Sequence, residues 1–413
     1  MRVLLIALIN THGTWVPLNL LYLAGTLDAN GIDCTVVDQS IVGTNGVFKE
    51  VYEGQYDIVG LSVLTDIRWG AFDMARVVRK LSPRSKIVMG GVHATLMPEQ
   101  CKKYCDVVIK GDGEGPFLDL CQGKEPRPRF LPIDEIPFPA WHKIDLFRYP
   151  ARGVSKYDRR RVNGIKLHKT PRISIQATRS CQSHCRFCSS WYVQGPYRMR
   201  SPKLVVDEME LLYNRGIRSF YFNDDSFYLD RTVGIDFCRE LIRRDLEVAF
   251  HIETRADVLD LEYARWLKAA GCYRVQVGVE TGSDAILAQM HKDTDTEAVY
   301  EGIRNCRKAG LRVEALMIIG NEGETDETIE ETRRFLRKAK PHTVTSTWDG
   351  LLLFPGTAVY RRAVKEGMIT DAFWDTREKI KAYKFTPEQL HKWNARIASY
   401  TMLSRLRYWV RQL

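Results

Sequence analysis

The stretch Cys181-Gln182-Ser183-His184-Cys185-Arg186-Phe187-Cys188 places three cysteines at the spacing C-x3-C-x2-C. It follows a short apolar run at residues 173–177, and a run of that length between loops is typical of a buried strand. The cysteines are therefore expected in a loop at the carboxyl end of a strand. Grouped cysteines in a chain without a secretory signal indicate metal binding rather than a disulfide framework. The remaining cysteines are scattered through apolar segments and are interpreted as core residues: Cys34, Cys101, Cys105, Cys121, Cys238, Cys272 and Cys306.

An iron–sulfur cluster explains this spacing better than zinc does. Thiolates bind iron–sulfur clusters, and a [4Fe–4S] cluster takes four ligands. Cys181, Cys185 and Cys188 would leave one iron open, and an open iron can chelate the amino and carboxylate groups of S-adenosylmethionine (SAM). A structural zinc site closes with four protein ligands, and His184, the nearby candidate, would make a cramped fourth.

The chain around this motif alternates apolar runs with helical segments. The predicted strands of this part are residues 173–177, 219–222, 248–252, 274–279, 312–319 and 343–347. Six β–α units within residues 171–358 predict a (β/α)6 partial TIM barrel. The functional residues of barrels gather at the C-terminal ends of the strands, where the cysteine motif also lies.

Residues 1–123 alternate in the same way. The predicted strands are residues 3–9, 34–37, 58–63, 86–89 and 107–109, and the predicted helices are residues 17–30, 47–52 and 69–81. Continuous apolar strands are buried on both faces, so this part is expected to be an α/β, Rossmann-like, doubly wound parallel sheet. Ligands bind such sheets beyond the carboxyl ends of the strands.

Two segments break the alternation. Residues 124–170 are rich in proline and basic side chains and predict an interdomain linker, whereas residues 359–413 predict a helical C-terminal region. The composition, with 45% hydrophobic and 27% charged residues, is that of an ordinary globular protein. The apolar opening at residues 1–9 is read as a buried strand rather than a signal peptide, so a cytoplasmic location is expected.

The cysteine stretch resembles the signature loop of the radical SAM superfamily, C-x3-C-x-aromatic-C, with Phe187 at the aromatic position. Asn223-Asp224-Asp225-Ser226-Phe227 looks like the acidic motif that ends the family's second strand, and Gly278-Val279-Glu280-Thr281-Gly282-Ser283 looks like the motif at the fourth. The resemblance implies SAM contacts from Phe187, Asp224, Asp225, Arg255 and Glu280. The sequence departs from the family's Gly-x-Pro-Gly-Glu, because Glu322 replaces the proline, which weakens any inference about adenine contacts there.

The first domain resembles the cobalamin-binding module that precedes many radical SAM enzymes, including class B methyltransferases, the anaerobic magnesium-protoporphyrin ester cyclase and hopanoid methylases. A hydroxyl pair and a glycine pair at strand ends would allow close backbone approach to a large ligand. The residues implied to contact cobalamin are Ser62, Thr65, Gly90, Gly91, His93, Gly111 and Glu114. The cobalt-ligating pattern D-x-H-x-x-G is absent, and His12 lies in the equivalent loop without it.

The resemblance implies a cobalamin-dependent radical SAM methyltransferase that methylates an unactivated carbon of a small molecule, through a 5′-deoxyadenosyl radical and methylcobalamin. One alternative is a non-methylating oxidation, cyclisation or rearrangement by the same architecture, and another is RNA modification. The expected partners are a small-molecule substrate and an electron donor such as flavodoxin or ferredoxin, with no DNA. A basic amphipathic helix near the C-terminus leaves membrane-surface contact open, but packing on the barrel is favoured.

Overall fold

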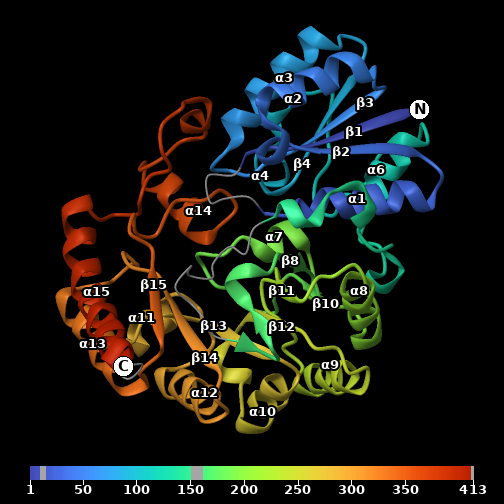
Figure 1. The fold of residues 1–413 in the computed structure, drawn as a ribbon. Coiled ribbons are helices and arrows are strands. Elements are labelled where there is room, and N and C mark those ends of the chain that lie inside the picture. The colour runs from blue at the N-terminus through green and yellow to red at the C-terminus, as the bar shows by residue number, and fades with distance from the viewer. Residues whose placement is uncertain (10–14, 150–160, 411–413) are drawn as a thin grey trace.

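The computed structural model describes residues 1–9, 15–149 and 161–410, with the side chains described up to residue 398. Two parallel sheets lie one above the other, each covered by helices, and a C-terminal region spans both (Figure 1). No helix in the described part of the chain is long and apolar enough to cross a membrane.

The N-terminal sheet is doubly wound, as predicted. Its strands are β1 (Arg2–Ala7), β2 (Asp33–Asp38), β3 (Ile58–Ser62), β4 (Lys86–Gly90) and β5 (Val107–Val108). They are parallel and adopt the order β2-β1-β3-β4-β5. The chain reverses its winding between β1 and β3, so a crevice for ligands is expected at the carboxyl ends of these two strands.

Helices cover both faces of this sheet. They are α1 (Leu18–Ala29), α2 (Gln39–Gly54), α3 (Arg68–Leu81), α4 (Val92–Leu96), α5 (Pro98–Cys101) and α6 (Glu114–Cys121). Helix α2 begins eight positions before the predicted start, because the Asp38 side chain caps it by accepting from the Ser40 amide. A backbone break at Gly43, with φ of 75°, separates this early turn from the predicted helical segment.

The second sheet is the predicted partial barrel. Its strands are β8 (Arg172–Ile175), β11 (Ser219–Phe222), β12 (Ala249–Thr254), β13 (Cys272–Glu280), β14 (Arg312–Met317) and β15 (Thr343–Ser346). They pair in parallel and in chain order from β8 to β15. The helices between them are α7 (Ser190–Gln194), α8 (Pro202–Asn214), α9 (Arg231–Arg243), α10 (Leu261–Ala269), α11 (Asp284–Gln289), α12 (Thr296–Lys308) and α13 (Asp326–Ala339). Short antiparallel pairs join β6 (Arg161–Val162) to β7 (Ile165–Lys166) and β9 (Thr178–Arg179) to β10 (Arg198–Met199).

Residues 136–149 of the linker carry its buried side chains, whereas residues 124–135 are mostly exposed. The Ala140 amide donates to Leu21 O of α1 at 2.9 Å. The buried Trp141 indole donates to Glu208 of α8 at 3.2 Å. The buried Tyr149 hydroxyl donates to Asp38 at 2.9 Å. The linker therefore contacts both α1 and the barrel helix α8. Most of its basic residues lie outside the described part of the chain.

The C-terminal region touches both domains. Helix α14 (Ala358–Lys365) is followed by a 3-10 turn (Asp371–Asp375) and by α15 (Pro387–Val410). Trp374 is fully buried beside the N-terminal sheet, where the guanidinium of Arg68 lies 5.0 Å from its ring. Helix α15 packs on α13 and β15, and its apolar side chains at Leu390, Trp393 and Ile397 are buried. The start of α15 is thus packed on the barrel, whereas Leu403, Leu406, Trp409 and Val410 lie beyond the described side chains.

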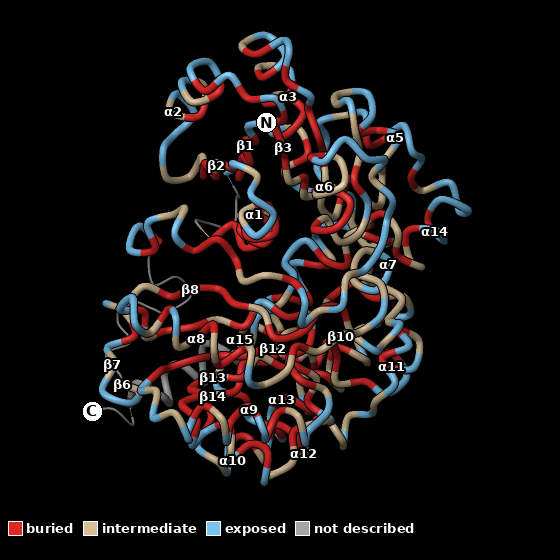
Figure 2. Tube along the Cα trace, turned by 90° about the vertical axis from the view of Figure 1, so that its right-hand side faces the viewer, coloured by how far each residue is buried: buried red, intermediate tan, exposed pale blue. Residues whose placement is uncertain are grey.

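Buried side chains form one apolar core that runs from α1 and α6 through the linker into the barrel, and a second core lies beneath α2 and α3. In Figure 2 the buried segments follow the strands of both sheets. Because the larger core crosses the domain boundary, the two sheets are expected to behave as one unit.

Two helical glycines offer a matched test of this packing. A Cβ on Gly302 of α12 would lie 2.0 Å from the carbonyl oxygen of Ala256, whereas one on Gly70 of α3 would meet nothing within 4 Å. We expect Gly302→Ala to lower the free energy of unfolding by about 1–3 kcal/mol or more, since the clash is with backbone. Gly70→Ala should raise it by about 0.5–1 kcal/mol through helix propensity. Urea unfolding of both variants measures the difference, and equal effects would contradict the structure.

Candidate functional site

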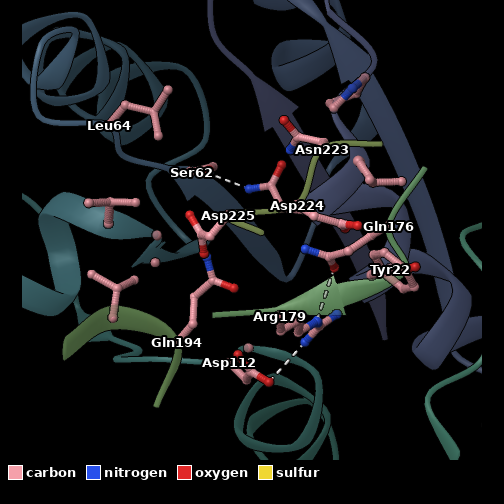
Figure 3. Close-up of a pocket in the computed structure, with 18 of the residues that line it drawn as sticks. Tyr22, Ser62, Leu64, Asp112, Gln176, Arg179, Gln194, Asn223, Asp224 and Asp225 are labelled. Atoms are coloured by element: carbon pink, nitrogen blue, oxygen red, sulfur yellow. Dashed lines mark hydrogen bonds and ion pairs between the residues drawn. The ribbon is translucent and has the colours of Figure 1, made fainter. Parts of the chain in front are cut away.

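A cavity of about 850 Å³ lies where the carboxyl ends of the two sheets face each other. One wall comes from the N-terminal domain, including Ser62 and Leu64, and the other from the barrel, including Asp224 and Asp225 (Figure 3). Both walls are built from loops that follow strands, which is where ligands of these two folds bind.

The three cysteines of the motif line this cavity, and each is half-buried. The amide of Ser190, at the start of α7, donates to the sulfur of Cys188 at 3.4 Å. Burial raises the pKa of the Cys188 thiol to about 12, so metal binding there must displace a proton. In the described residues no three His, Cys, Asp or Glu side chains converge as ligands of a single ion. Thiolates that each bind a different iron of a cluster do not need to converge in this way.

Arg255 supports the cysteine loop from below. Its guanidinium donates to Ser183 Oγ at 2.5 Å, to the Lys292 carbonyl oxygen at 2.9 Å, and to Asp257 at 2.5 Å. These contacts occupy most of its donors. Arg255 lines the cavity, and these hydrogen bonds make it an anchor of the loop.

The two aspartates after β11 have different surroundings. Asp224 Oδ1 accepts from the amides of Ala177 and Thr178 at 2.9 and 3.1 Å, whereas Oδ2 is buried without a hydrogen-bond partner among the described residues. Burial raises the pKa of Asp224 to about 8. Asp225 accepts from Ser190 and Gln194 at 2.5 and 2.6 Å. Asp224 therefore has one acceptor available for a donor that enters the cavity.

Glu280 forms a buried ion pair at the end of β13. Its Oε1 lies 2.5 Å from Lys292 Nζ, and its backbone has a φ of 64°. Burial lowers the pKa of Lys292, but Glu280 and Cys185 together raise it above its ordinary value. Nearby, burial together with the charge of Glu280 raises the pKa of Glu253 to about 7. The barrel side of the cavity is thus rich in carboxylates, with Lys292 as a neighbouring cation.

The N-terminal wall combines polar and apolar groups. Asn19 donates to Ser62 Oγ at 2.7 Å, and the apolar side chains of Leu8, Leu64 and Val92 also line the cavity. Gly91 has a φ of 95°, and a Cβ there would lie 3.1 Å from Ser62 Oγ. Gly90, Gly91 and Gly111 all line the cavity, as do Phe187 and Ser62.

Two residues assigned to cobalamin on the sequence do not reach the cavity. Thr65 and His93 are buried behind the wall of the cavity, where His93 Nδ1 lies 3.3 Å from Thr65 Oγ1. His93 Nε2 lies 2.6 Å from Gln100 Oε1, and its ring lies 5.8 Å from that of Trp374. The reason is that His93 sits inside the first turn of α4 and faces the C-terminal region. His12 lies outside the described residues, and no described cavity residue is a histidine.

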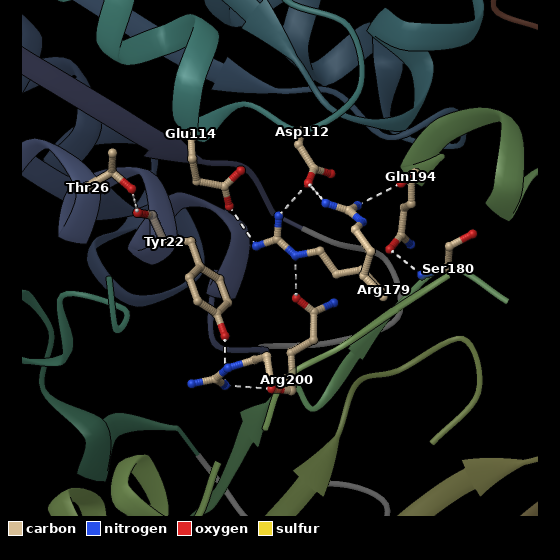
Figure 4. Close-up of polar contacts among 10 residues, drawn as sticks. Tyr22, Thr26, Asp112, Glu114, Arg179, Ser180, Gln194 and Arg200 are labelled. Atoms are coloured by element: carbon tan, nitrogen blue, oxygen red, sulfur yellow. Dashed lines mark hydrogen bonds and ion pairs between the residues drawn. The ribbon is translucent and has the colours of Figure 1, made fainter. Parts of the chain in front are cut away.

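Glu114 lines the cavity and also joins the two domains. Its carboxylate accepts from Arg179 of the barrel at 2.7 Å. Arg179 also pairs with Asp112 at 2.9 Å, and Arg198 pairs with the same Asp112 oxygen at 2.7 Å. Figure 4 shows this network across the domain boundary. The loop at residues 111–115 thus holds the domains together through buried charges, and Glu114 has its carboxylate committed to that contact.

Comparison with known protein families identifies both domains. A model of the radical SAM superfamily matches residues 175–336, and a model of the B12 binding domain matches residues 4–121. The uncharacterized methyltransferase PH0819 of Pyrococcus horikoshii is 27% identical over 92% of this chain and 86% of its own length. The anaerobic magnesium-protoporphyrin IX monomethyl ester cyclase of Rubrivivax gelatinosus is 31% identical over 80% of this chain, which spans 63% of the cyclase.

The chain combines a radical SAM domain with a B12-binding domain. A radical SAM domain binds SAM at a [4Fe–4S] cluster, and a B12-binding domain binds cobalamin. The structure of the radical SAM methyltransferase TsrM from Kitasatospora setae, with cobalamin and a [4Fe–4S] cluster bound, superposes with a TM-score of 0.71. That match covers 88% of this chain and 75% of TsrM at 22% identity, and it shows the shared fold.

Several residues that line the cavity of this radical SAM enzyme were not identified from the sequence. Arg179, Glu253 and Lys292 line the cavity but lie outside the sequence motifs. Arg179 is the last residue of β9, and Glu253 lies next to the last residue of β12. Their position at the ends of strands could have marked them as candidate site residues. No sequence feature marked Lys292, because the turn after α11 is what brings it to Glu280.

We expect Arg179→Met to destabilise this radical SAM enzyme by about 3–5 kcal/mol, because it leaves the Glu114 carboxylate buried without a cation. Urea unfolding measures the change, with the exposed Arg265→Met as the matched control. Adding Glu114→Gln to Arg179→Met should recover part of the loss, since a neutral amide is less costly to bury. A loss no larger than that of the control would show that the network contributes little.

The raised pKa of Asp224 predicts a pH dependence in the absence of SAM. The ordinary pKa is 3.8 and the folded value is about 8, so between these values the folded chain keeps a proton that the unfolded chain releases. The free energy of unfolding therefore falls as pH rises through this window. Asp224→Asn keeps the acceptor for the two amides and should flatten this slope. Urea midpoints at pH 5.5 and 8 test it, and an unchanged slope in the variant would refute the assignment.

Proposed function

We propose that the chain methylates an unactivated carbon of a small-molecule substrate, using SAM and cobalamin in one cavity. The observation that carries the proposal is that a single cavity is lined both by the three cysteines and by the ligand-facing end of the B12-type sheet. Radical formation and methyl delivery must act on the same substrate atom in turn, and a shared cavity allows that without release.

The donor set on the barrel side fits the cluster and SAM. Cys181, Cys185 and Cys188 would ligate three irons, leaving the fourth for SAM. SAM carries an ammonium group, and the unpartnered buried oxygen of Asp224 is a suitable acceptor. Asp225 and Glu253 add carboxylate oxygens at the same end of the barrel, and Phe187 lies in the loop beside them. When bound, the reduced cluster supplies the electron that cleaves SAM.

The donor set on the other side fits cobalamin. The flat faces of a corrin ring suit the apolar side chains of Leu8, Leu64 and Val92, whereas its amide arms suit Ser62 and Asn19. Gly90, Gly91 and Gly111 expose backbone toward the same space. Thr65 and His93 support this wall from behind, and Glu114 supports it through Arg179.

The protein's own contribution is to position and enclose the reactants. Arg255 holds the cysteine loop, and Arg179 holds the two walls at a fixed separation. The similarity to the cyclase supports a non-methylating radical reaction as the second candidate. We further propose a cytoplasmic location, an electron-transfer protein as reductant, and the division into residues 1–123, 124–170, 171–358 and 359–413.

A label experiment separates methylation from the alternative. The reconstituted enzyme is given SAM with a deuterated methyl group, a reductant and candidate metabolites, and products are read by mass spectrometry. We expect the product to gain the deuterated methyl group in place of hydrogen. A changed product without the label would support the cyclase-type alternative and contradict methylation.

The cysteines provide the control for that experiment. Replacing Cys181, Cys185 and Cys188 together by Ala should remove the cluster absorbance, SAM cleavage and labelled product. Cys306→Ala, in the buried core, should leave all three in place. Four irons retained in the triple variant would overturn the assignment of these ligands.

A further inference from the structure

The outer side of the cysteine loop carries exposed aromatic side chains. Helix α7 begins two residues after Cys188, and its Ser190 amide contacts the Cys188 sulfur. Trp191 and Tyr192 of this helix are 40% and 43% exposed, which places them among the few exposed large apolar side chains of the described chain. Adjacent exposed aromatics of this kind mark interaction sites more often than single ones do.

Helix α14 extends this surface. Arg361 donates to the Tyr192 hydroxyl at 2.8 Å, and its guanidinium lies 5.0 Å from the Tyr192 ring. The amide of Val359 donates to the Arg186 carbonyl at 3.2 Å, so α14 rests directly on the cysteine loop. Val364 and Lys365 follow Arg361 by three and four residues, and therefore lie on the same helix face.

This surface is positively charged. Arg186, Arg361 and Lys365 form no ion pair with a carboxylate in the described part of the chain. The neighbouring Arg362, by contrast, is paired with Glu322 at 2.7 Å and with Glu366 at 2.9 Å. We call this surface the cluster-side patch. Its members are Arg186, Trp191, Tyr192, Arg361, Val364 and Lys365.

We propose that the cluster-side patch docks an acidic one-electron donor protein, a reduced flavodoxin or ferredoxin, which rests on the proposed cluster site. The patch has an aromatic centre and a cationic rim, which complement an acidic partner. It lies immediately outside Cys188, so a docked donor has a short path to the bound cluster. The donor loses one electron, the cluster gains it, and no bond forms or breaks in this step. The donor then leaves in its oxidised form.

Stopped-flow reduction of the loaded enzyme tests this docking. Absorbance follows the cluster while either reduced flavodoxin or dithionite supplies electrons, because dithionite is small and needs no docking surface. Arg361→Glu and Lys365→Glu should each lower the rate with flavodoxin by about tenfold at low salt, with a weaker effect at high salt. The rate with dithionite should not change. Arg334→Glu, an exposed reversal on α13, is the matched control and should alter neither rate.

Lys365→Glu separates a docking defect from local damage to α7, because the contact of α14 with Tyr192 is made by Arg361. Trp191→Ala should also slow reduction by flavodoxin, but without changing its salt dependence. Unchanged flavodoxin rates in the three patch variants, or equal losses with both reductants in Lys365→Glu, would overturn the proposal. Normal reduction without labelled product would contradict the proposed methylation and leave the docking surface standing.

Discussion

The buried ion pairs of Arg179 with Asp112 and Glu114 determine how the two domains face each other. The side chains of Arg179, Asp112 and Glu114 are almost fully buried. Separation of the domains would therefore leave these charges without their partners. Charge–charge contacts in such surroundings are strong only when geometry is well satisfied. Arg179 meets this condition with Gln176, Asp112 and Glu114 around one guanidinium. The cavity exists because this contact holds two sets of strand ends opposite each other.

The rest of the structure reinforces that arrangement by packing. The linker joins α1 to the barrel through Trp141, and the C-terminal region joins the barrel to α3 and α5 through Trp374. The larger apolar core runs without interruption across the boundary. Such coupling is useful to an enzyme whose reactive groups come from different domains, since a small displacement of either wall would misplace the reacting atoms.

Inside the cavity, the carboxylates differ in the number of partners that they have. Glu280 has Lys292, Asp225 has two neutral donors, and Asp224 retains one unpartnered oxygen. Several carboxylates in a buried site repel one another, which is why burial and neighbouring charge raise the pKa of Glu253 to about 7. A cationic ligand relieves that repulsion. The site is therefore less stable empty than with a positively charged ligand such as SAM.

The sequence by itself determined the two α/β folds, the loop that carries the cysteines and the strand ends where polar residues gather. These features depend on local periodicity and spacing, which are visible in a single chain. The resemblance of their motifs to those of the radical SAM superfamily also made Asp224, Asp225 and Glu280 candidates for SAM binding. Only the tertiary structure decided that Glu114 binds Arg179, that Thr65 is buried against His93, which faces Trp374, and that Lys292 meets Glu280. Each of those outcomes depends on which distant element packs against a residue, and neither spacing nor composition encodes that contact.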